Sequence, residues 1–91
     1  KEVNIMYDYP LDYTWSTEEI IDVMALYNAV EQAYEGGISK EEFMQCYRRY
    51  TQIVDSKSAQ KQIDAEFEKV STYSIYKVSQ LAKDNDWIEI K

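Results

Sequence analysis

The chain has 91 residues, a formal net charge of −7 and no histidine, and its hydrophobic content of 45% is ordinary for a globular protein. This length fits a single domain with a real core, and only 2 Gly and 1 Pro favour helices over hairpins. The negative charge opposes binding to nucleic acid or to an anionic membrane surface, and the missing histidine excludes Ser-His-Asp, Cys-His and His-ligated zinc sites.

The acidity is concentrated in the first half of the chain. Residues 1–46 hold 2 Lys and 10 Asp/Glu, whereas residues 47–91 hold 8 Lys/Arg and 7 Asp/Glu. The single cysteine, Cys46, excludes an internal disulfide and fits a reducing compartment. No apolar run is long enough for a membrane span, and no stretch has the order of a signal peptide, so we expect a cytoplasmic protein.

The first 15 residues predict an extended arm rich in aromatic side chains. Apolar residues alternate with others from Val3 to Tyr9, and Pro10 ends the pattern. We expect residues 1–15 to lie across the helices, held by Leu11 and Trp15.

The stretch 16–36 predicts the first helix. Ser16 and Glu19 have the spacing of a capping box, and Gly36 with Gly37 offers left-handed geometry to end the helix. The apolar residues recur at helical spacing, which predicts an inward stripe of Ile20, Val23, Tyr27, Val30 and Tyr34.

Ser39 and Glu42 predict a second capping box and a helix over 39–54, antiparallel to the first because the connection is short. Its inward stripe is Phe43, Tyr47, Tyr50 and Val54.

Two further helices are predicted over 57–70 and 73–84. The inward residues are Ala59, Ile63, Phe67 and Val70 in the third, and Ile75, Tyr76, Val78 and Leu81 in the fourth. Residues 85–91 predict a frayed or extended tail, with pairing to the arm or continuation of the helix as alternatives. The whole chain, 1–91, is therefore predicted to be one all-α domain: a small bundle of three to four helices with an N-terminal aromatic arm.

Seven short motifs occur in order along roughly residues 7–83: Tyr9-Pro10-Leu11-Asp12, Trp15-Ser16-Thr17-Glu18-Glu19, Asn28-Ala29-Val30-Glu31, Ala33-Tyr34-Glu35, Ser56-Lys57, Lys61-Gln62-Ile63-Asp64 and Tyr73-Ser74-Ile75-Tyr76. In this order they resemble the YktA-like, UPF0223-type family of uncharacterised proteins from Gram-positive bacteria. The resemblance implies an all-helical fold and no particular chemistry. The chain departs from the family's pattern at two turns, with Asp55 where proline is common and Thr72 where glycine is common.

No residue set predicts catalysis, a cofactor or a metal. Glu18 with Asp22 and Glu31 with Glu35 lie one helical turn apart and could chelate a hard cation, but a solvated acidic face is the favoured interpretation. Cys46 has no activating base and is predicted to be a buried small hydrophobe.

One anion site is a hypothesis. Ser56, Lys57, Ser58 and Lys61 cluster at the start of the third helix, where free N–H groups and the helix dipole favour a phosphate, and Arg48 and Arg49 are expected nearby. The favoured alternative is that Ser56 only caps the helix and the lysines pair with carboxylates.

Tyrosine is unusually abundant, with 9 Tyr against 2 Phe and 2 Trp. Because tyrosine is enriched at binding hot spots, Tyr73, Ser74 and Tyr76 form a candidate protein interface, although rings that only fix helix packing are the favoured reading of this cluster. We expect a non-enzymatic interaction or regulatory module that binds another protein or itself. The alternatives are a small-anion or nucleotide-binding protein, or an enzyme using carboxylate, Tyr and Lys groups.

Overall fold

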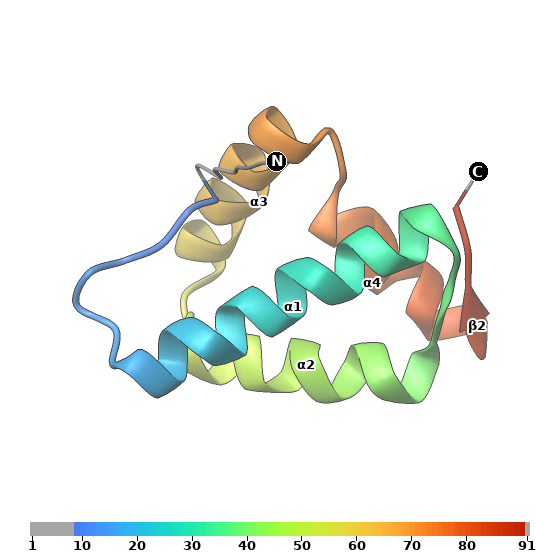
Figure 1. Cartoon of the computed structure of the whole chain (residues 1–91), viewed down its shortest axis with the longest axis horizontal. Helices are drawn as coiled ribbons and strands as arrows, with labels where there is room; N and C mark the ends of the chain where they lie inside the picture. The colour runs from blue at the N-terminus through green and yellow to red at the C-terminus, as the bar shows by residue number, and fades with distance from the viewer. Residues whose placement is uncertain (1–8, 91) are drawn as a thin grey trace, which may run out of the picture.

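The computed structural model describes residues 9–90, so the alternating pattern that begins at Val3 lies mostly outside the described residues. The elements in order are α1 (Thr17–Glu35), β1 (Ile38–Ser39), α2 (Lys40–Ile53), α3 (Lys57–Ser71), α4 (Ile75–Asp84) and β2 (Trp87–Ile88). Figure 1 shows α1 and α2 side by side, with α3 and α4 following as a second pair. The all-α prediction is confirmed, since four helices and one two-stranded sheet account for the regular structure of the described chain. None of these helices is long and apolar enough to cross a membrane.

Each helix begins at a serine whose side chain accepts a hydrogen bond from the N–H three residues on: Ser16, Ser39, Ser56 and Ser74. At Ser16 the predicted capping box is complete, because the Glu19 carboxylate accepts from the Ser16 N–H in return. At Ser39 the predicted box is half formed, and the Glu42 carboxylate accepts from the Ser39 hydroxyl instead, at 3.2 Å. These caps satisfy N–H groups that a helix cannot pair internally.

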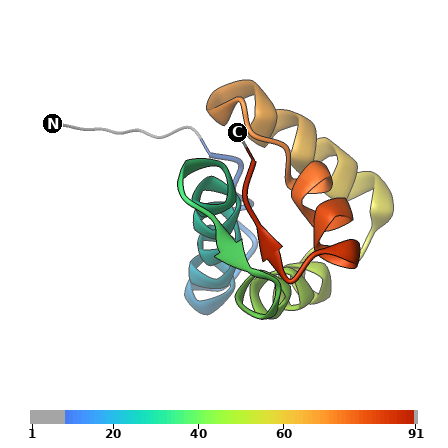
Figure 2. The same ribbon diagram turned by 90° about the vertical axis from the view of Figure 1, so that its right-hand side faces the viewer.

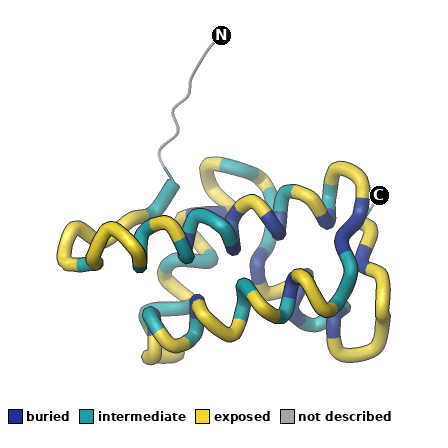
Figure 3. The backbone as a smooth tube through the Cα atoms, turned by 60° about the horizontal axis from the view of Figure 1, so that its bottom comes forward, coloured by how far each residue is buried: buried dark blue, intermediate teal, exposed yellow. Residues whose placement is uncertain are grey.

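The α1–α2 hairpin forms one side of the core. Val23, Leu26, Tyr27 and Val30 of α1 have no exposed surface, and Phe43 of α2 is equally buried. Figure 3 shows buried stretches recurring along the helices between exposed ones. The predicted inward stripes of α1 and α2 therefore describe the faces that pack.

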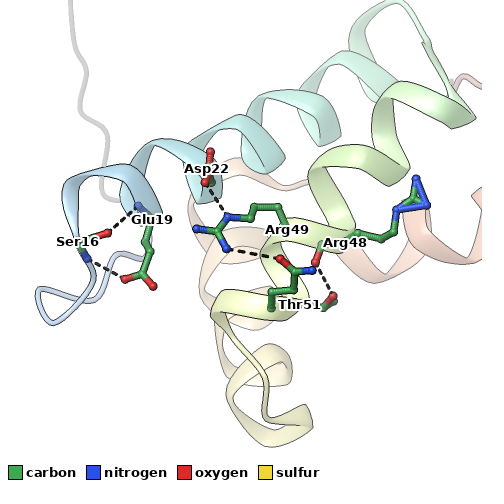
Figure 4. A network of polar contacts seen from close by, with 7 residues as sticks. Ser16, Glu19, Asp22, Arg48, Arg49 and Thr51 are labelled. Atoms are coloured by element: carbon green, nitrogen blue, oxygen red, sulfur yellow. Dashed lines mark hydrogen bonds and ion pairs between the residues drawn. The ribbon is translucent and has the colours of Figure 1, made fainter.

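An ion pair on the exposed side of the hairpin links α1 to α2. Arg49 Nε of α2 donates to Asp22 Oδ2 of α1 at 2.8 Å (Figure 4). Both side chains are well exposed, so the pair stabilises the fold by at most about 1 kcal/mol.

An aromatic cluster joins α1, α3 and the arm. The rings of Tyr27 and Phe67 stack with centroids 4.7 Å apart, and Tyr9 meets both edge-on. The Tyr27 hydroxyl donates to the Pro10 carbonyl at 2.6 Å. Tyr9 and Tyr27 thus hold the described part of the arm, whereas Leu11, predicted to do so, is 41% exposed.

The arm's other predicted anchor, Trp15, is partly buried against the core. The hydroxyl of Tyr9 also donates to the Glu31 carboxylate on α1. The arm is therefore fixed at both ends of its described length.

The turn between α3 and α4 has left-handed backbone at Thr72, with φ 69°. A β-branched residue is disfavoured there, which explains why glycine suits this position. Tyr73 and Ser74 complete the turn, so α4 begins at Ile75, two residues later than predicted.

Two residues predicted to face inward are exposed, Val70 at 45% and Tyr76 at 63%. In α3 the inward row from Phe67 continues at Ser71, whose hydroxyl donates to the Phe67 carbonyl at 2.6 Å. In α4 the inward positions belong to Val78 and its neighbours on the same face, Ile75 and Ala82. In both helices the wrongly predicted residue is a sequence neighbour of one that faces inward: Val70 precedes Ser71, and Tyr76 follows Ile75.

The C-terminal segment pairs with the connection between α1 and α2. β2 runs antiparallel to β1, with Ile38 opposite Ile88 and Ser39 opposite Trp87 (Figure 2). Two flanking hydrogen bonds of 2.8 Å extend the contact, from Lys40 N to the Asp86 carbonyl and from Ile90 N to the Ala33 carbonyl. The tail is extended, as predicted, but it is paired rather than frayed, and its partner is not the arm.

Gly37 is required where this strand pair begins. Its φ is +108°, and a Cβ there would lie 2.6 Å from Cε2 and 2.7 Å from Nε1 of the Trp87 ring. Only glycine fits both the backbone and the close approach of the indole. Gly36 has extended φ of −176° and open space around its Cα, so it makes no such demand.

We therefore predict that Gly37→Ala lowers the free energy of unfolding by about 1–3 kcal/mol, the cost of backbone strain of this kind. Gly36→Ala is the matched control and should change stability much less. Urea denaturation of both variants measures this, and equal losses would contradict the role assigned to Gly37.

Candidate functional site

An open hollow of about 690 Å³ lies between α2, α3 and α4. We call it the lysine groove; its lining comes from α2 (Lys40, Met44, Tyr47, Tyr50, Thr51), α3 (Lys57, Gln60, Lys61, Asp64) and α4 (Ile75, Tyr76, Ser79, Gln80, Ala82, Lys83). Its surface is mostly apolar. Open apolar hollows with a few polar groups at their edges are the usual form of binding sites.

Two hydrogen bonds place the three walls of the groove. Gln60 Nε2 of α3 donates to the Val54 carbonyl at the end of α2, at 2.7 Å. Asp64 Oδ1 of α3 accepts from the Ile75 N–H at the start of α4, at 2.9 Å. The first bond ties α3 to the end of α2 and the second ties α3 to the start of α4, so together they position α3 between the other two walls.

The groove is locally positive although the chain carries a net charge of −7. Its lining holds four lysines, Lys40, Lys57, Lys61 and Lys83, against one acidic residue, Asp64. The ion pair found between described residues joins Arg49 and Asp22 and involves none of these lysines. The four ammonium groups are therefore available to an anionic ligand.

Tyr50 adds a buried donor to the lining. Its side chain is 1% exposed, and its hydroxyl is a buried side-chain oxygen with no hydrogen-bond partner among the described residues. Burial, followed by the nearby Tyr47 and Asp64, raises the pKa of Tyr50 well above its ordinary value, so the hydroxyl stays protonated. An unpaired buried hydroxyl carries an energetic penalty.

Comparison with known proteins places the chain in a family. The model of an uncharacterised protein family, UPF0223, matches residues 6–91. The chain belongs to the UPF0223 family. It is 53% identical to a UPF0223 protein of Bacillus mycoides over 86% of this chain and 88% of the relative. It is 44% identical to the UPF0223 protein YktA of Bacillus subtilis over 93% of this chain and 97% of the relative. The resemblance found in the ordered motifs is confirmed, and the family description names no activity.

In this UPF0223 fold, the residues of the hypothetical anion site are divided. Lys57 and Lys61 line the lysine groove, but Ser56 and Ser58 do not. The Ser56 hydroxyl caps α3 by accepting from Ala59 N, and it lies 2.9 Å from the Ser58 hydroxyl. Neither arginine expected nearby lines the groove, and Arg49 is paired with Asp22.

The residues of the candidate interface are also divided. Tyr73 stacks on Tyr34 with centroids 4.3 Å apart, and Ser74 caps α4 while its N–H donates to the Tyr34 hydroxyl. Both residues therefore support helix packing. Tyr76 is exposed and lines the lysine groove, which brings it to the same site as Lys57 and Lys61.

Three other titratable groups that were weighed for chemistry, Cys46, Glu31 and Glu35, do not form a reactive site in this UPF0223 chain. Cys46 is half-buried, and burial, then Glu42 and Asp22, raises the pKa of its thiol, which disfavours the reactive thiolate. Glu31 and Glu35, weighed as a cation pair, accept from tyrosine hydroxyls instead. Within residues 9–90 no group of three or more His, Cys, Asp or Glu is placed to hold a metal.

Several groove residues were not singled out from the sequence, including Lys40, Lys83 and Met44. A signal was present: Lys40, Met44, Tyr47 and Thr51 recur at helical spacing and form a second stripe on α2. Of the predicted inward stripe, Phe43 and Val54 pack in the core and do not line the groove, whereas Tyr47 and Tyr50 also line it.

The two buried tyrosines predict opposite effects of losing a hydroxyl. Tyr27→Phe removes the bond to Pro10 and should lower the free energy of unfolding by about 1 kcal/mol. Tyr50→Phe removes an unpaired group and should leave stability unchanged or raise it by up to about 1 kcal/mol. Urea unfolding of the pair decides this, and an equal loss in Tyr50→Phe would show that its hydroxyl has a partner.

The contact between Tyr73 and Glu35 predicts a pH dependence. The Tyr73 hydroxyl donates to Glu35 Oε2 at 2.7 Å, and this bond is the main cause that raises the pKa of Tyr73 to about 12. The protonated phenol is the stabilised form, so the contribution to stability is full below pH 10 and is lost as the pH rises through 12. Carbon NMR of the Tyr73 ring should show the pKa falling toward 10 in Glu35→Ala but not in the control Glu41→Ala. An unchanged pKa in Glu35→Ala would refute this cause.

Proposed function

We propose that this UPF0223 chain is a non-enzymatic cytoplasmic interaction module that binds another protein in the lysine groove. The observation that carries the proposal is the groove itself: an apolar hollow walled by three helices and lined by four lysines that have no ion pair within residues 9–90. Interfaces commonly combine an apolar centre with a polar rim.

Tyr76 supports a protein as the ligand. It is a large ring, 63% exposed, at the wall of the groove, and tyrosine is among the residues most often found at binding hot spots. Most of the Tyr76 side chain is not packed against the core. The cytoplasmic assignment is supported by the free thiol of Cys46, which suits a reducing compartment.

A second candidate function is binding of a small anionic molecule such as a nucleotide. The specific support is that Lys57 and Lys61, on the first two turns of α3, line one groove together with Tyr50. The groove volume is within the range of small-molecule sites. A thermal shift on adding nucleotides or inorganic phosphate would favour this candidate.

Crosslinking inside cells tests the main proposal. A photoreactive benzoylphenylalanine replaces Tyr76 in the chain expressed in Bacillus subtilis, which has a UPF0223 relative. We expect a discrete adduct with another protein after irradiation, because the new side chain takes the exposed place of Tyr76 in the groove wall.

The matched control carries the same photoreactive residue at Glu68, which is exposed on α3 and does not line the groove. This position should give no adduct of that size. Absence of an adduct at position 76, or equal adducts at both positions, would refute binding of a protein in the lysine groove.

A further inference from the structure

We infer that the occupant of the lysine groove is an acidic amphipathic helix of a partner protein. This inference rests on the proposed function and specifies the chemistry of the partner. It follows from the spacing of the groove residues, the surface they form and the sign of their charge.

The spacing is the same on all three walls. Lys40, Met44 and Tyr47 of α2, Lys57, Lys61 and Asp64 of α3, and Tyr76, Gln80 and Lys83 of α4 are each four and then three residues apart. This is the spacing of one helix face. Three helix faces turned to one hollow are what a bundle presents to an additional helix.

The length of the groove suits a short helix. The α2 stripe runs from Lys40 to Thr51, which is about 16 Å along a helix axis at 1.5 Å per residue. A partner helix of three turns matches this length. A helix also satisfies its own backbone groups, which an extended peptide could not do on a mostly apolar floor.

The surface and the charge specify the side chains of that helix. Met44, Tyr47 and Tyr76 offer an apolar floor and wall to leucine-sized side chains. Lys40, Lys57, Lys61 and Lys83 stand around this floor, and their aliphatic stems can pack while the ammonium groups meet carboxylates. The lone acidic lining residue, Asp64, accepts a hydrogen bond from Ile75 N, and its single negative charge is outnumbered by the four lysines. An apolar face flanked by Glu or Asp is therefore the complement of this groove.

Three stapled helices of about 12 residues, labelled with fluorescein, serve as probes; at about 18 Å they span the groove. The first has leucines along one face and glutamates beside them, the second has lysines in place of the glutamates, and the third has serines in place of the leucines. Fluorescence anisotropy with the whole chain should show binding of the first helix only. Its affinity should weaken as sodium chloride is raised from about 50 to 500 mM, because the ion pairs are screened.

Matched lysine variants locate the binding. Lys61→Gln with Lys83→Gln should weaken the acidic helix by about three- to tenfold, as expected for two partly exposed ion pairs. Lys69→Gln with Lys77→Gln removes the same charge from the same two helices outside the groove and should weaken it less than twofold. Circular dichroism of both variants checks that they fold.

The inference would be overturned by equal binding of the acidic and basic helices, by equal effects of the two double variants, or by no binding of any helix. Displacement of the acidic helix by millimolar inorganic phosphate would assign the lysines to a small anion and also overturn it. If analytical ultracentrifugation shows a dimer that the acidic helix dissociates, the groove binds a second copy of this chain, and the inference fails. If the helices fail while the crosslink at position 76 persists, the interaction function stands with another occupant; if that crosslink is absent, the proposed function fails as well.

Discussion

The packing of Tyr27 is the contact on which the other elements depend. Its ring lies at the middle of α1 with no exposed surface, stacked on Phe67 of α3, and its hydroxyl holds the arm at Pro10. A phenol in this position must pair its hydroxyl, since a buried unpaired one is costly, and the Pro10 carbonyl meets that need. One side chain therefore fixes where α3 crosses the α1–α2 hairpin. The groove between α2, α3 and α4 follows from that placement, because α3 turns one side to Tyr27 and another to the hollow.

The two buried phenols of the core show how the same residue type serves the fold and the site. Tyr27 is satisfied internally, whereas Tyr50 is equally buried and has no partner among the described residues. Tyr50 borders the groove and Tyr27 does not. Tyr50, the exposed Tyr76 and four lysines without an ion pair among the described residues all border one groove, while Tyr34 and Tyr73 lie elsewhere and are stacked and hydrogen-bonded.

Local chemistry made the helices predictable. Four serines begin the four helices, and their capping depends only on residues within one turn. The β1–β2 pair was missed because two residues of strand have no periodic signal and their partner comes from the other half of the chain. The site was predictable in part: Lys57, Lys61 and Tyr76 were recognised separately. These residues come together only because α3 and α4 pack at a particular angle. Asp64 of α3 helps to fix that angle by accepting a hydrogen bond from the first N–H of α4, at Ile75.

The pairing of Ile38 with Ile88 constrains when the chain can fold. The α1–α2 hairpin is local and can form early, but Ile38 reaches its full burial only beside a residue near the end of the described chain. During synthesis, which is slow compared with helix formation, the connection at Gly37 stays uncovered until Trp87 has been added. Completion of the core is thus a late event that follows translation of the C-terminal segment. A chain that stops before residue 88 contains all four helices but leaves Ile38 without its partner, and such an incompletely covered core is what quality-control proteases act on.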